Sequence, residues 1–290
     1  MKKPVQVITI PFALGSHRRG CDLGPKAVLH AGLLQSLNEK GYHTTIQDVT
    51  VFPQENEENT QLKNIHSVKK SAILIEKATN AVMHNGNFPL IIGGDHSISI
   101  GTIPGIASHV KKLGVIWIDA HGDVNTHLTT PSGNIHGMSL AVNMGIGSPE
   151  LTELFSPKIE PSCVALIGVR DLDEGEIALL HEKNILYFGM EDVRQKGMTA
   201  IVGKINKHFS KQGVTGVHVS FDLDVMDPPL VQGVGTPVEN GLYYEEAKTC
   251  LHAIKKWENL VSFEVVEVNP LLDNRNETAS LAVRIINEII

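Results

Sequence analysis

The sequence predicts an α/β protein, a single-domain three-layer α/β/α sandwich around a mainly parallel sheet of about eight strands. Short apolar runs alternate with longer helix-patterned segments from one end of the chain to the other. No internal repeat, low-complexity tract or linker rich in Pro, Gly and Ser divides the chain. The chain has 290 residues, and 42% of them are hydrophobic. Residues 1–290 can therefore form a single domain that buries one large core.

The expected strands are short runs rich in β-branched residues and bounded by turn-forming residues, a pattern typical of buried strands. They lie at Val5–Ile10, Gln47–Phe52, Phe88–Ile92, Leu113–Ile118, Cys163–Gly168, Ile185–Phe188, Val214–Phe221 and Leu260–Glu267. Each is followed by a loop or a helix-patterned segment, which favours parallel pairing.

Three of the expected helices have clear boundaries or a clear apolar stripe. The first begins at Pro25 and ends before Gly41, because Pro is favoured in the first turn and Gly just after the last. A long helix is predicted from Glu57 to about Asn85, and the last from about Thr278 to Ile290. The inner stripe of the long helix consists of apolar residues at helical spacing, namely Leu62, Ile65, Val68, Ala72, Ile75 and Ala78.

Composition excludes several classes of partner. The net charge of −7 and the pI near 6.0 argue against nucleic acid, which favours a basic face. No run approaches the roughly 18 apolar residues of a membrane helix, and the apolar stretch near the N-terminus is too short for a signal peptide. Three widely spaced cysteines without a CxxC pair indicate reduced thiols and a cytoplasmic location.

Six potential metal ligands follow three of the predicted strands. They are His96 after the third, Asp119, His121 and Asp123 after the fourth, and Asp222 and Asp224 after the seventh. The carboxyl ends of parallel strands meet at one edge of the sheet, where α/β proteins bind ligands. So many acidic groups in one place would repel one another without a cation between them. The sequence therefore predicts a metal site, with two ions.

The donor set indicates which metal is expected. Four carboxylates and two imidazoles suit Mn²⁺ better than metals that prefer thiolates, although Zn²⁺, Fe²⁺, Co²⁺ or Ni²⁺ could also bind. Alternate residues of an extended segment point the same way, so Asp119, His121 and Asp123 are expected to face one cavity. The alternative for this segment taken alone is a solvated turn with Asp caps.

The motifs Gly93-Gly-Asp-His-Ser97, Asp119-Ala-His-Gly-Asp123 and Ser220-Phe-Asp-Leu-Asp224 resemble the three signatures of the ureohydrolase family, which contains arginase and agmatinase. The resemblance extends from Val5 to the final helix. It implies two Mn²⁺ per subunit and a homo-oligomer, trimer or hexamer. It also implies that Asp119 and Asp222 bridge the ions, that His96 and Asp123 complete one ion, and that His121 and Asp224 complete the other.

The stretch from Val124 to Gly137 resembles the loop of the arginase branch that reads the α-carboxylate of L-arginine. The resemblance gives that role to Asn125, Thr130, Ser132 and Asn134, whose neutral donors suit a carboxylate. An ordinary turn is the alternative for Ser132-Gly-Asn134. The segment after the fifth strand resembles the one that receives the α-ammonium group, with Asp173 as first candidate and Glu176 as second.

The same resemblance assigns the reacting groups. His136 becomes the proton shuttle and general acid, a role that suits an imidazole because its pKa lies near neutrality. Asp123 orients the hydroxide that bridges the ions. Glu267 holds the guanidinium and Thr236 neighbours that contact. From its pattern alone, Glu267 is either a paired buried charge or a substrate contact.

The sequence therefore predicts a cytoplasmic, Mn²⁺-dependent hydrolase that converts L-arginine to L-ornithine and urea. Another ureohydrolase, such as an agmatinase or a guanidino-acid hydrolase, is the nearest alternative. A catalytically silent arginine sensor and a metal-dependent deacetylase on a similar fold are the others. The chain has no dinucleotide-binding fingerprint, P-loop or nucleophile elbow.

Overall fold

A computed structural model of the protein describes residues 4–51 and 61–290. Its centre is one eight-stranded sheet with the order β2-β1-β3-β8-β7-β4-β5-β6, in which every neighbouring pair is parallel. The strands are β1 (Val5–Thr9), β2 (Thr44–Asp48), β3 (Phe88–Ile92), β4 (Leu113–Ile118), β5 (Val164–Val169), β6 (Leu186–Gly189), β7 (Gly216–Asp222) and β8 (Leu260–Val266). The expected fold class is confirmed.

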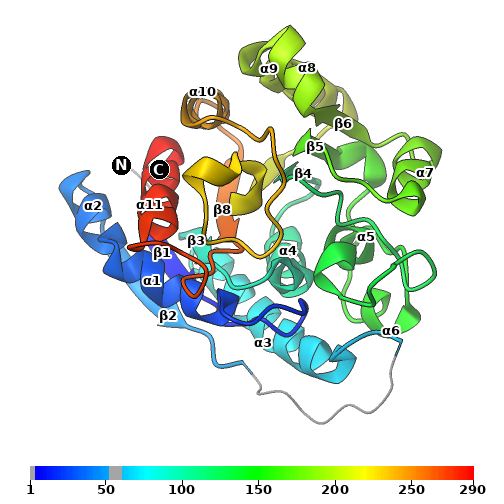
Figure 1. Ribbon diagram of the computed structural model, residues 1–290, viewed down its shortest axis with the longest axis horizontal. Helices are drawn as coiled ribbons and strands as arrows, with labels where there is room; N and C mark the ends of the chain where they lie inside the picture. The colour runs from blue at the N-terminus through cyan, green and yellow to red at the C-terminus, as the bar shows by residue number, and fades with distance from the viewer. Residues whose placement is uncertain (1–3, 52–60) are drawn as a thin grey trace.

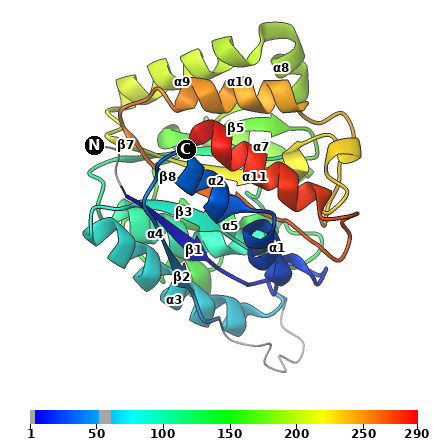
Figure 2. The ribbon, with the colours of Figure 1, turned by 90° about the vertical axis from the view of Figure 1, so that its left-hand side faces the viewer.

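Helices cover both faces of the sheet. They are α1 (Gly24–His30), α2 (Leu33–Glu39), α3 (Ile65–His84), α4 (Ser99–Ala107), α5 (Ser139–Asn143), α6 (Pro149–Thr152), α7 (Glu174–Glu182), α8 (Met190–Lys196), α9 (Met198–Gln212), α10 (Tyr244–Ile254) and α11 (Glu277–Ile289). Figures 1 and 2 show α9, α10 and α11 on one side of the sheet and α3 and α4 on the other. No helix among the described residues is long and apolar enough to cross a bilayer.

The alternation of side chains along each strand explains the two covered faces. In β4, Ile116 and Ile118 pack into the core beneath α9 to α11, while Val115 and Trp117 pack into the core beneath α3 to α5. Successive strand residues point to opposite faces, so a strand buried on both sides reads as a continuous apolar run. All six residues of β4 are buried.

The topology brings four strand ends together at the middle of the sheet. Strands β3, β8, β7 and β4 are consecutive neighbours in space, although they are far apart in sequence. Their carboxyl ends lead directly into the segments that begin at Gly93, Glu267, Asp222 and Asp119. The predicted ligands are therefore adjacent because β8, the last strand made, lies between β3 and β7.

The predicted bounds of the second strand are wrong. The second strand spans Thr44–Asp48 rather than Gln47–Phe52, and Phe52 lies outside the described residues. This is an edge strand whose register is set by pairing with β1, and Ile46 is 43% exposed. Its sequence therefore lacks the apolar run of a buried strand, and the prediction followed the apolar residues just beyond it.

The two predicted helices in the first third of the chain also differ from the structure. The helix expected to start at Pro25 is divided into α1 and α2 by Gly32, whose φ of 96° no right-handed helix allows. The long helix begins at Ile65 because Asn64 has a φ of 56°, and its expected first residues, 57–60, lie outside the described part. Its predicted apolar stripe is buried.

Candidate metal centre and substrate cavity

The turn after β3 places His96 through contacts with two other segments. A side chain at Gly94 would collide with the carbonyl oxygen of Phe12, 1.7 Å from an ideal Cβ, so only glycine fits there. Asp95 is fully buried and accepts hydrogen bonds from the N–H groups of Gly15 and Ser16. The main-chain N–H of His96 donates to Glu267 Oε1 over 2.9 Å. The imidazole is thus fixed at the sheet edge.

One nitrogen of His96 faces three carboxylates. Its Nδ1 lies 3.0 Å from Asp119 Oδ2, 3.1 Å from Asp123 Oδ2 and 3.2 Å from Asp222 Oδ2. None of these contacts has hydrogen-bond geometry, so this buried Nδ1 has no hydrogen-bond partner among the described residues. The ring stacks on Trp117, with centroids 3.8 Å apart and 7° between the planes.

The other nitrogen of His96 begins a buried polar chain. His96 Nε2 lies 2.8 Å from Ser220 Oγ, and that hydroxyl donates to Glu264 Oε1 over 2.9 Å. Thr102 Oγ1 donates to the second oxygen of Glu264 over 2.6 Å. Since the only hydroxyl proton of Ser220 goes to Glu264, Ser220 accepts from Nε2–H, and the lone pair of a neutral His96 lies on Nδ1. Such partners orient metal-binding imidazoles.

The second imidazole occupies the neighbouring position. His121 Nδ1 lies 3.1 Å from Asp224 Oδ2 and 3.4 Å from Asp119 Oδ1. Two groups of side chains therefore have the spacing of a metal site, with ligand atoms within 4.8 Å of one another. Asp119 belongs to both groups; the first adds His96 and Asp123, and the second adds His121 and Asp224.

Asp222 belongs to neither group, although its Oδ2 approaches His96 as closely as the other carboxylates do. Its Oδ1 accepts a hydrogen bond from the N–H of Asp224 over 2.7 Å. The structure brings all six predicted ligands to one place. The individual ion that each residue would bind stays a prediction.

The charges of these groups conflict when no cation is present. Burial, together with neighbouring carboxylates, raises the pKa of Asp222 well above its usual range and also raises the pKa of Asp123 and Asp224. Burial acts against the charged form of Asp119, yet the two imidazoles hold its pKa below the usual value. Burial opposes protonation of His96 and His121, but the surrounding carboxylates raise both pKa values. In the metal-free site, bound protons therefore reduce the repulsion between these carboxylates, which a cation could also do.

The donor set fits divalent ions with a preference for oxygen and imidazole ligands. The unpaired Nδ1 of His96 points at three carboxylate oxygens, as a ligand nitrogen would beside a shared ion. Neither group with metal-site spacing contains a cysteine. Oxygen and imidazole donors without thiolates suit a divalent ion, and the expected Mn²⁺ is one that such donors bind.

One part of the sequence argument is wrong even though its residues converge. Asp119, His121 and Asp123 do not form a regular extended segment, because Asp123 has a φ of 52°, in the left-handed region. The reversal turns Asp123 toward His96, whereas His121 points to Asp224. Regular alternation would have sent all three side chains the same way.

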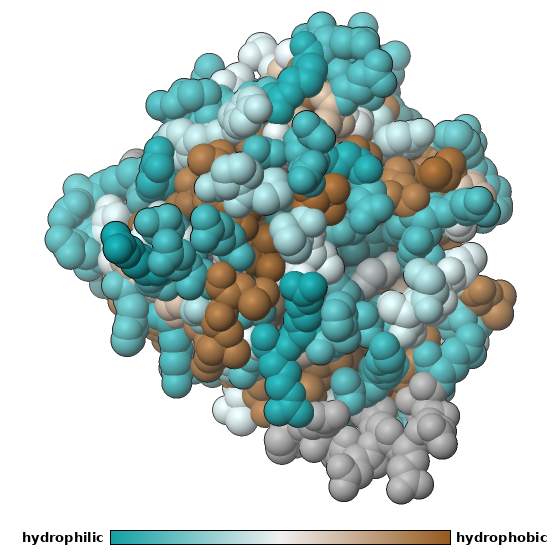
Figure 3. Space-filling view, in the orientation of Figure 1, coloured by the Kyte–Doolittle hydropathy of each residue, from teal (hydrophilic) through white to brown (hydrophobic). Residues whose placement is uncertain are grey.

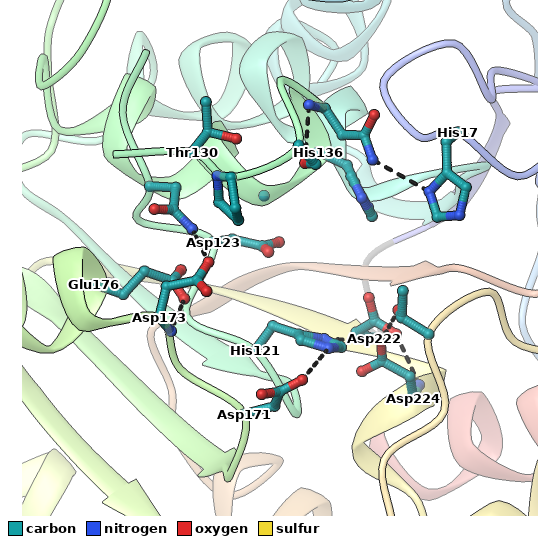
Figure 4. Close-up of a pocket in the computed structure, with 16 residues that line it drawn as sticks. His17, His121, Asp123, Thr130, His136, Asp171, Asp173, Glu176, Asp222 and Asp224 are labelled. Atoms are coloured by element: carbon teal, nitrogen blue, oxygen red, sulfur yellow. Dashed lines mark hydrogen bonds and ion pairs between the residues drawn. The ribbon is translucent and has the colours of Figure 1, made fainter. Parts of the chain in front are cut away.

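A cavity of about 250 Å³ opens over this centre. Figure 4 shows His121, Asp222 and Asp224 on one side of it, Asp173 and Glu176 on another, and His17 near His136. The predicted carboxylate-reading residues Asn125, Thr130, Ser132 and Asn134 all line the cavity, as does Thr236. Thr236 also donates a hydrogen bond to Asp224 Oδ2 over 2.9 Å.

The two predicted ammonium-binding residues lie at the start of α7 and differ in exposure. Asp173 accepts a hydrogen bond from Asn125 Nδ2 over 2.7 Å. Glu176 is buried, and its carboxylate accepts from the N–H groups of Val124 and Asp173, each over 3.0 Å. Burial raises the pKa of Glu176 to about 7. Asp173 is exposed at the cavity, whereas both oxygens of the buried Glu176 accept hydrogen bonds that support the loop.

His136 and Glu267 form a pair beside the metal ligands. His136 Nδ1 lies 3.2 Å from Glu267 Oε1, and this carboxylate raises the pKa of His136 to about 9 against the effect of burial. Cys21 donates its thiol hydrogen to Glu267 Oε2 over 3.2 Å. Glu267 is 2% exposed and does not line the cavity, so its carboxylate is a paired buried charge in this structure.

Sequence reasoning missed the role of Arg170. The five N–H groups of its guanidinium lie within hydrogen-bond distance of six main-chain carbonyl oxygens, with Nη2 shared among three of them; the six belong to Gly168, Asp224, Val225, Met226, Val238 and Glu239. These contacts tie the end of β5 to the segment that carries Asp224 and Thr236. The signal for this role was weak, because an arginine after a strand looks the same whether it faces solvent or carbonyl groups.

Comparison with known proteins is consistent with the site. The sequence model described as "Arginase family" matches residues 3–290. The chain is 44% identical to the arginase of Bacillus caldovelox, over 99% of this chain and 98% of the relative. It is 42% identical to the arginase of Bacillus subtilis (strain 168), over 100% and 98% of the two chains.

Solved structures give the same picture. The native structure of the Bacillus caldovelox arginase at pH 5.6 superposes with a TM-score of 0.95 and 44% identity, covering 99% of this chain and 98% of that one. An Entamoeba histolytica arginase in complex with L-ornithine superposes with a TM-score of 0.92 and 32% identity, with the same coverage. The likeness therefore covers the whole sheet and the loops at its carboxyl edge.

Proposed function

The chain belongs to the arginase family, and from that premise we propose that it hydrolyses the guanidinium group of L-arginine to give L-ornithine and urea, with two Mn²⁺ per subunit. The observation that carries the proposal is the position of Asp119. Its carboxylate belongs to two adjacent ligand groups at the floor of a cavity lined by neutral donors and by Asp173.

The residues that would hold the ions are those described above. His96 and Asp123 would complete one ion, His121 and Asp224 the other, and Asp119 and Asp222 would be shared. When bound, two such ions would lower the pKa of an adjacent water and supply a nucleophile at neutral pH. Asp123, which contacts His96 and also lines the cavity, would accept a hydrogen bond from that water and orient it.

The loop and α7 would position the amino-acid end of the substrate. The neutral donors of Asn125, Ser132 and Asn134 can pair with an α-carboxylate without repelling it. The Asp173 carboxylate can pair with the α-ammonium group. Agmatine lacks the carboxylate and would leave these donors without that partner, including the buried Asn125 and Asn134, which can cost about 10⁴-fold in kcat/KM.

His136 and Glu267 would handle the leaving end. The imidazole at the cavity wall can carry a proton from solvent to the departing amine. Its partner Glu267 holds the ring in place, with Oε1 3.2 Å from His136 Nδ1. A direct pairing of Glu267 with the guanidinium requires its carboxylate to turn toward the cavity. Oε2 has the thiol of Cys21 as its donor, and this weak donor is readily replaced.

The test is urea release by the purified protein, first stripped of metal and then reloaded with Mn²⁺. L-Arginine, agmatine and a guanidino acid would be compared at equal concentration, with metal content measured on the same samples. Urea from L-arginine alone supports the proposal. Faster release from agmatine would identify the neighbouring branch of the family, and no release from any guanidine would refute hydrolysis.

We also propose a cytoplasmic homo-oligomer, a trimer or a hexamer. The three cysteines are free and buried, which suits a reducing compartment. Figure 3 shows a mostly hydrophilic face on which apolar side chains gather over α1 and the segment after β8. Leu23, directly before α1, and Leu271, after β8, are 41% and 64% exposed, and exposed apolar groups favour protein contacts. Light scattering at several concentrations would give the subunit number.

A further inference from the structure

Residues 61–64 hold the cavity-lining loop in place through hydrogen bonds to its main chain at His127 and Gly133. Gln61 Nε2 donates to the carbonyl of His127 over 2.6 Å, and the N–H of Lys63 donates to the carbonyl of Gly133 over 2.9 Å. Gly133 has a φ of 74°, and a Cβ there would lie 2.4 Å from the carbonyl oxygen of Gln61. The close approach therefore depends on glycine, and it brings Lys63 beside Asn134.

The side chain of Lys63 determines which way the Asn134 amide faces. Lys63 Nζ lies 3.1 Å from Asn134 Oδ1. An ammonium group has only donors, so the amide atom that it contacts must be the oxygen. The amide nitrogen lies 3.2 Å from His17 Nδ1 and can donate one N–H to that ring nitrogen. Its second N–H is left for the cavity, which Asn134 lines.

The orientation of the Asn134 amide determines whether it can bind a negatively charged carboxylate. An asparagine that turns its oxygen inward presents an acceptor, whereas one that turns its nitrogen inward presents a donor. A substrate carboxylate accepts hydrogen bonds only. Without the cation, the two orientations of the amide differ little, because His17 Nδ1 can pair with either atom by changing its tautomer.

We propose that Lys63 is a specificity-determining positioning residue, which holds the N–H of Asn134 toward the cavity so that the site prefers ligands with an α-carboxylate. This inference rests on the proposed function, because it takes L-arginine as the substrate. Lys63 does not line the cavity, so it acts through Asn134 and through its positive charge at the rim.

The test compares ligands that differ only in the carboxylate. Binding of L-ornithine and of 1,4-diaminobutane to the Mn²⁺-loaded protein would be measured by calorimetry, for the wild type and for Lys63→Met. We expect L-ornithine to bind about tenfold more weakly to the variant, the effect of about one charged hydrogen bond, and 1,4-diaminobutane to bind as before. The KM for L-arginine should rise by a similar factor, with kcat within about twofold.

Two further variants separate the amide orientation from the charge. Lys63→Gln keeps a donor for Asn134 Oδ1 without the charge, and recovery of most of the affinity would assign the effect to orientation. Lys69→Met is the matched control, because Lys69 pairs with Glu150 at the surface, over 3.1 Å, away from the cavity. It should leave both affinities unchanged.

The outcomes distinguish this inference from the proposed function. A wild type that releases no urea refutes the function, while the two binding measurements still report on Lys63. If Lys63→Met weakened the binding of both ligands equally, Lys63 would hold the loop in place without contributing to selectivity. That result would overturn the inference. Unchanged binding of L-ornithine would do the same.

Discussion

Arg170 Nη2 donates a hydrogen bond to the main-chain carbonyl of Asp224 over 2.9 Å. The guanidinium thus holds the backbone of a predicted metal ligand from outside the metal centre. Its other N–H groups reach the carbonyl groups of the next two residues, Val225 and Met226, and that of Val238, near Thr236. A single side chain therefore keeps the second ligand group in place.

Replacing Arg170 with glutamine should lower the free energy of unfolding by about 3 kcal/mol, because several carbonyl groups lose a charged donor at once. Lysine should recover only part of this, since an ammonium cannot match the planar fork. Chemical denaturation with and without Mn²⁺ would measure both effects. Arg284→Gln, which removes an exposed cation that stacks on Tyr244, is the control. Equal stability of the Arg170 and Arg284 variants would contradict this account.

Replacing Asp222 with asparagine should stabilise the metal-free protein and abolish its stabilisation by Mn²⁺. Burial and two neighbouring carboxylates raise the pKa of Asp222, so its ionised form opposes folding. That penalty is absent below the unfolded-state pKa of about 3.9 and grows as the pH rises above it. The gain should be on the order of 1 kcal/mol at neutral pH and should vanish in acid.

Thermal melting of both proteins at several pH values, with chelator and with Mn²⁺, would test this. A variant that is less stable than the wild type in chelator at neutral pH would contradict the repulsion argument. Undiminished stabilisation by Mn²⁺ would show that Asp222 is not a ligand.

Binding of Mn²⁺ should release protons and weaken as the pH falls. In the metal-free protein, the surrounding carboxylates raise the pKa of His96 and of His121 against the effect of burial. These shifts favour the protonated form of both imidazoles when no metal is bound, and a ligand must lose its proton to bind a metal. Calorimetric titration in two buffers with different ionisation enthalpies would count the protons. Identical heats in both buffers would contradict the prediction.

His136→Asn should lower turnover by about 10²- to 10⁴-fold and leave the metal content unchanged, because His136 belongs to neither ligand group. Metal analysis and steady-state urea release on the same preparation would separate the two effects. His43→Asn, at an exposed position after α2, serves as the control. Loss of metal from the His136 variant would place this residue in the metal centre instead.

The sequence was sufficient for the ligands because each one lies at the end of a buried strand or in the turn that follows it, and a parallel sheet gathers such positions at one edge. It was insufficient where backbone reversals decide the geometry. Asp123 and Asn64 take left-handed conformations, for which an aspartate or an asparagine is permitted but not required. These reversals decide which ligand group Asp123 joins and where α3 begins.

Contacts across long stretches of chain were also beyond prediction. Lys63 reaches Asn134 and Cys21 reaches Glu267 only because the loops fold over the same sheet edge. Neither side chain belongs to a motif. Likewise, the strand order could not be read from the pattern of apolar runs, which gives the number of strands but not their neighbours.

The placement of β8 has a consequence for biosynthesis. A ribosome that has translated as far as α10 has already produced all six predicted ligands, yet the strand that separates β3 from β7 does not exist. His96 then has no fixed position relative to Asp119 or Asp222. The ligand group that contains His96 can therefore form only once β8 has been translated, whereas the group of Asp119, His121 and Asp224 follows β4 and β7, which are neighbours made before it.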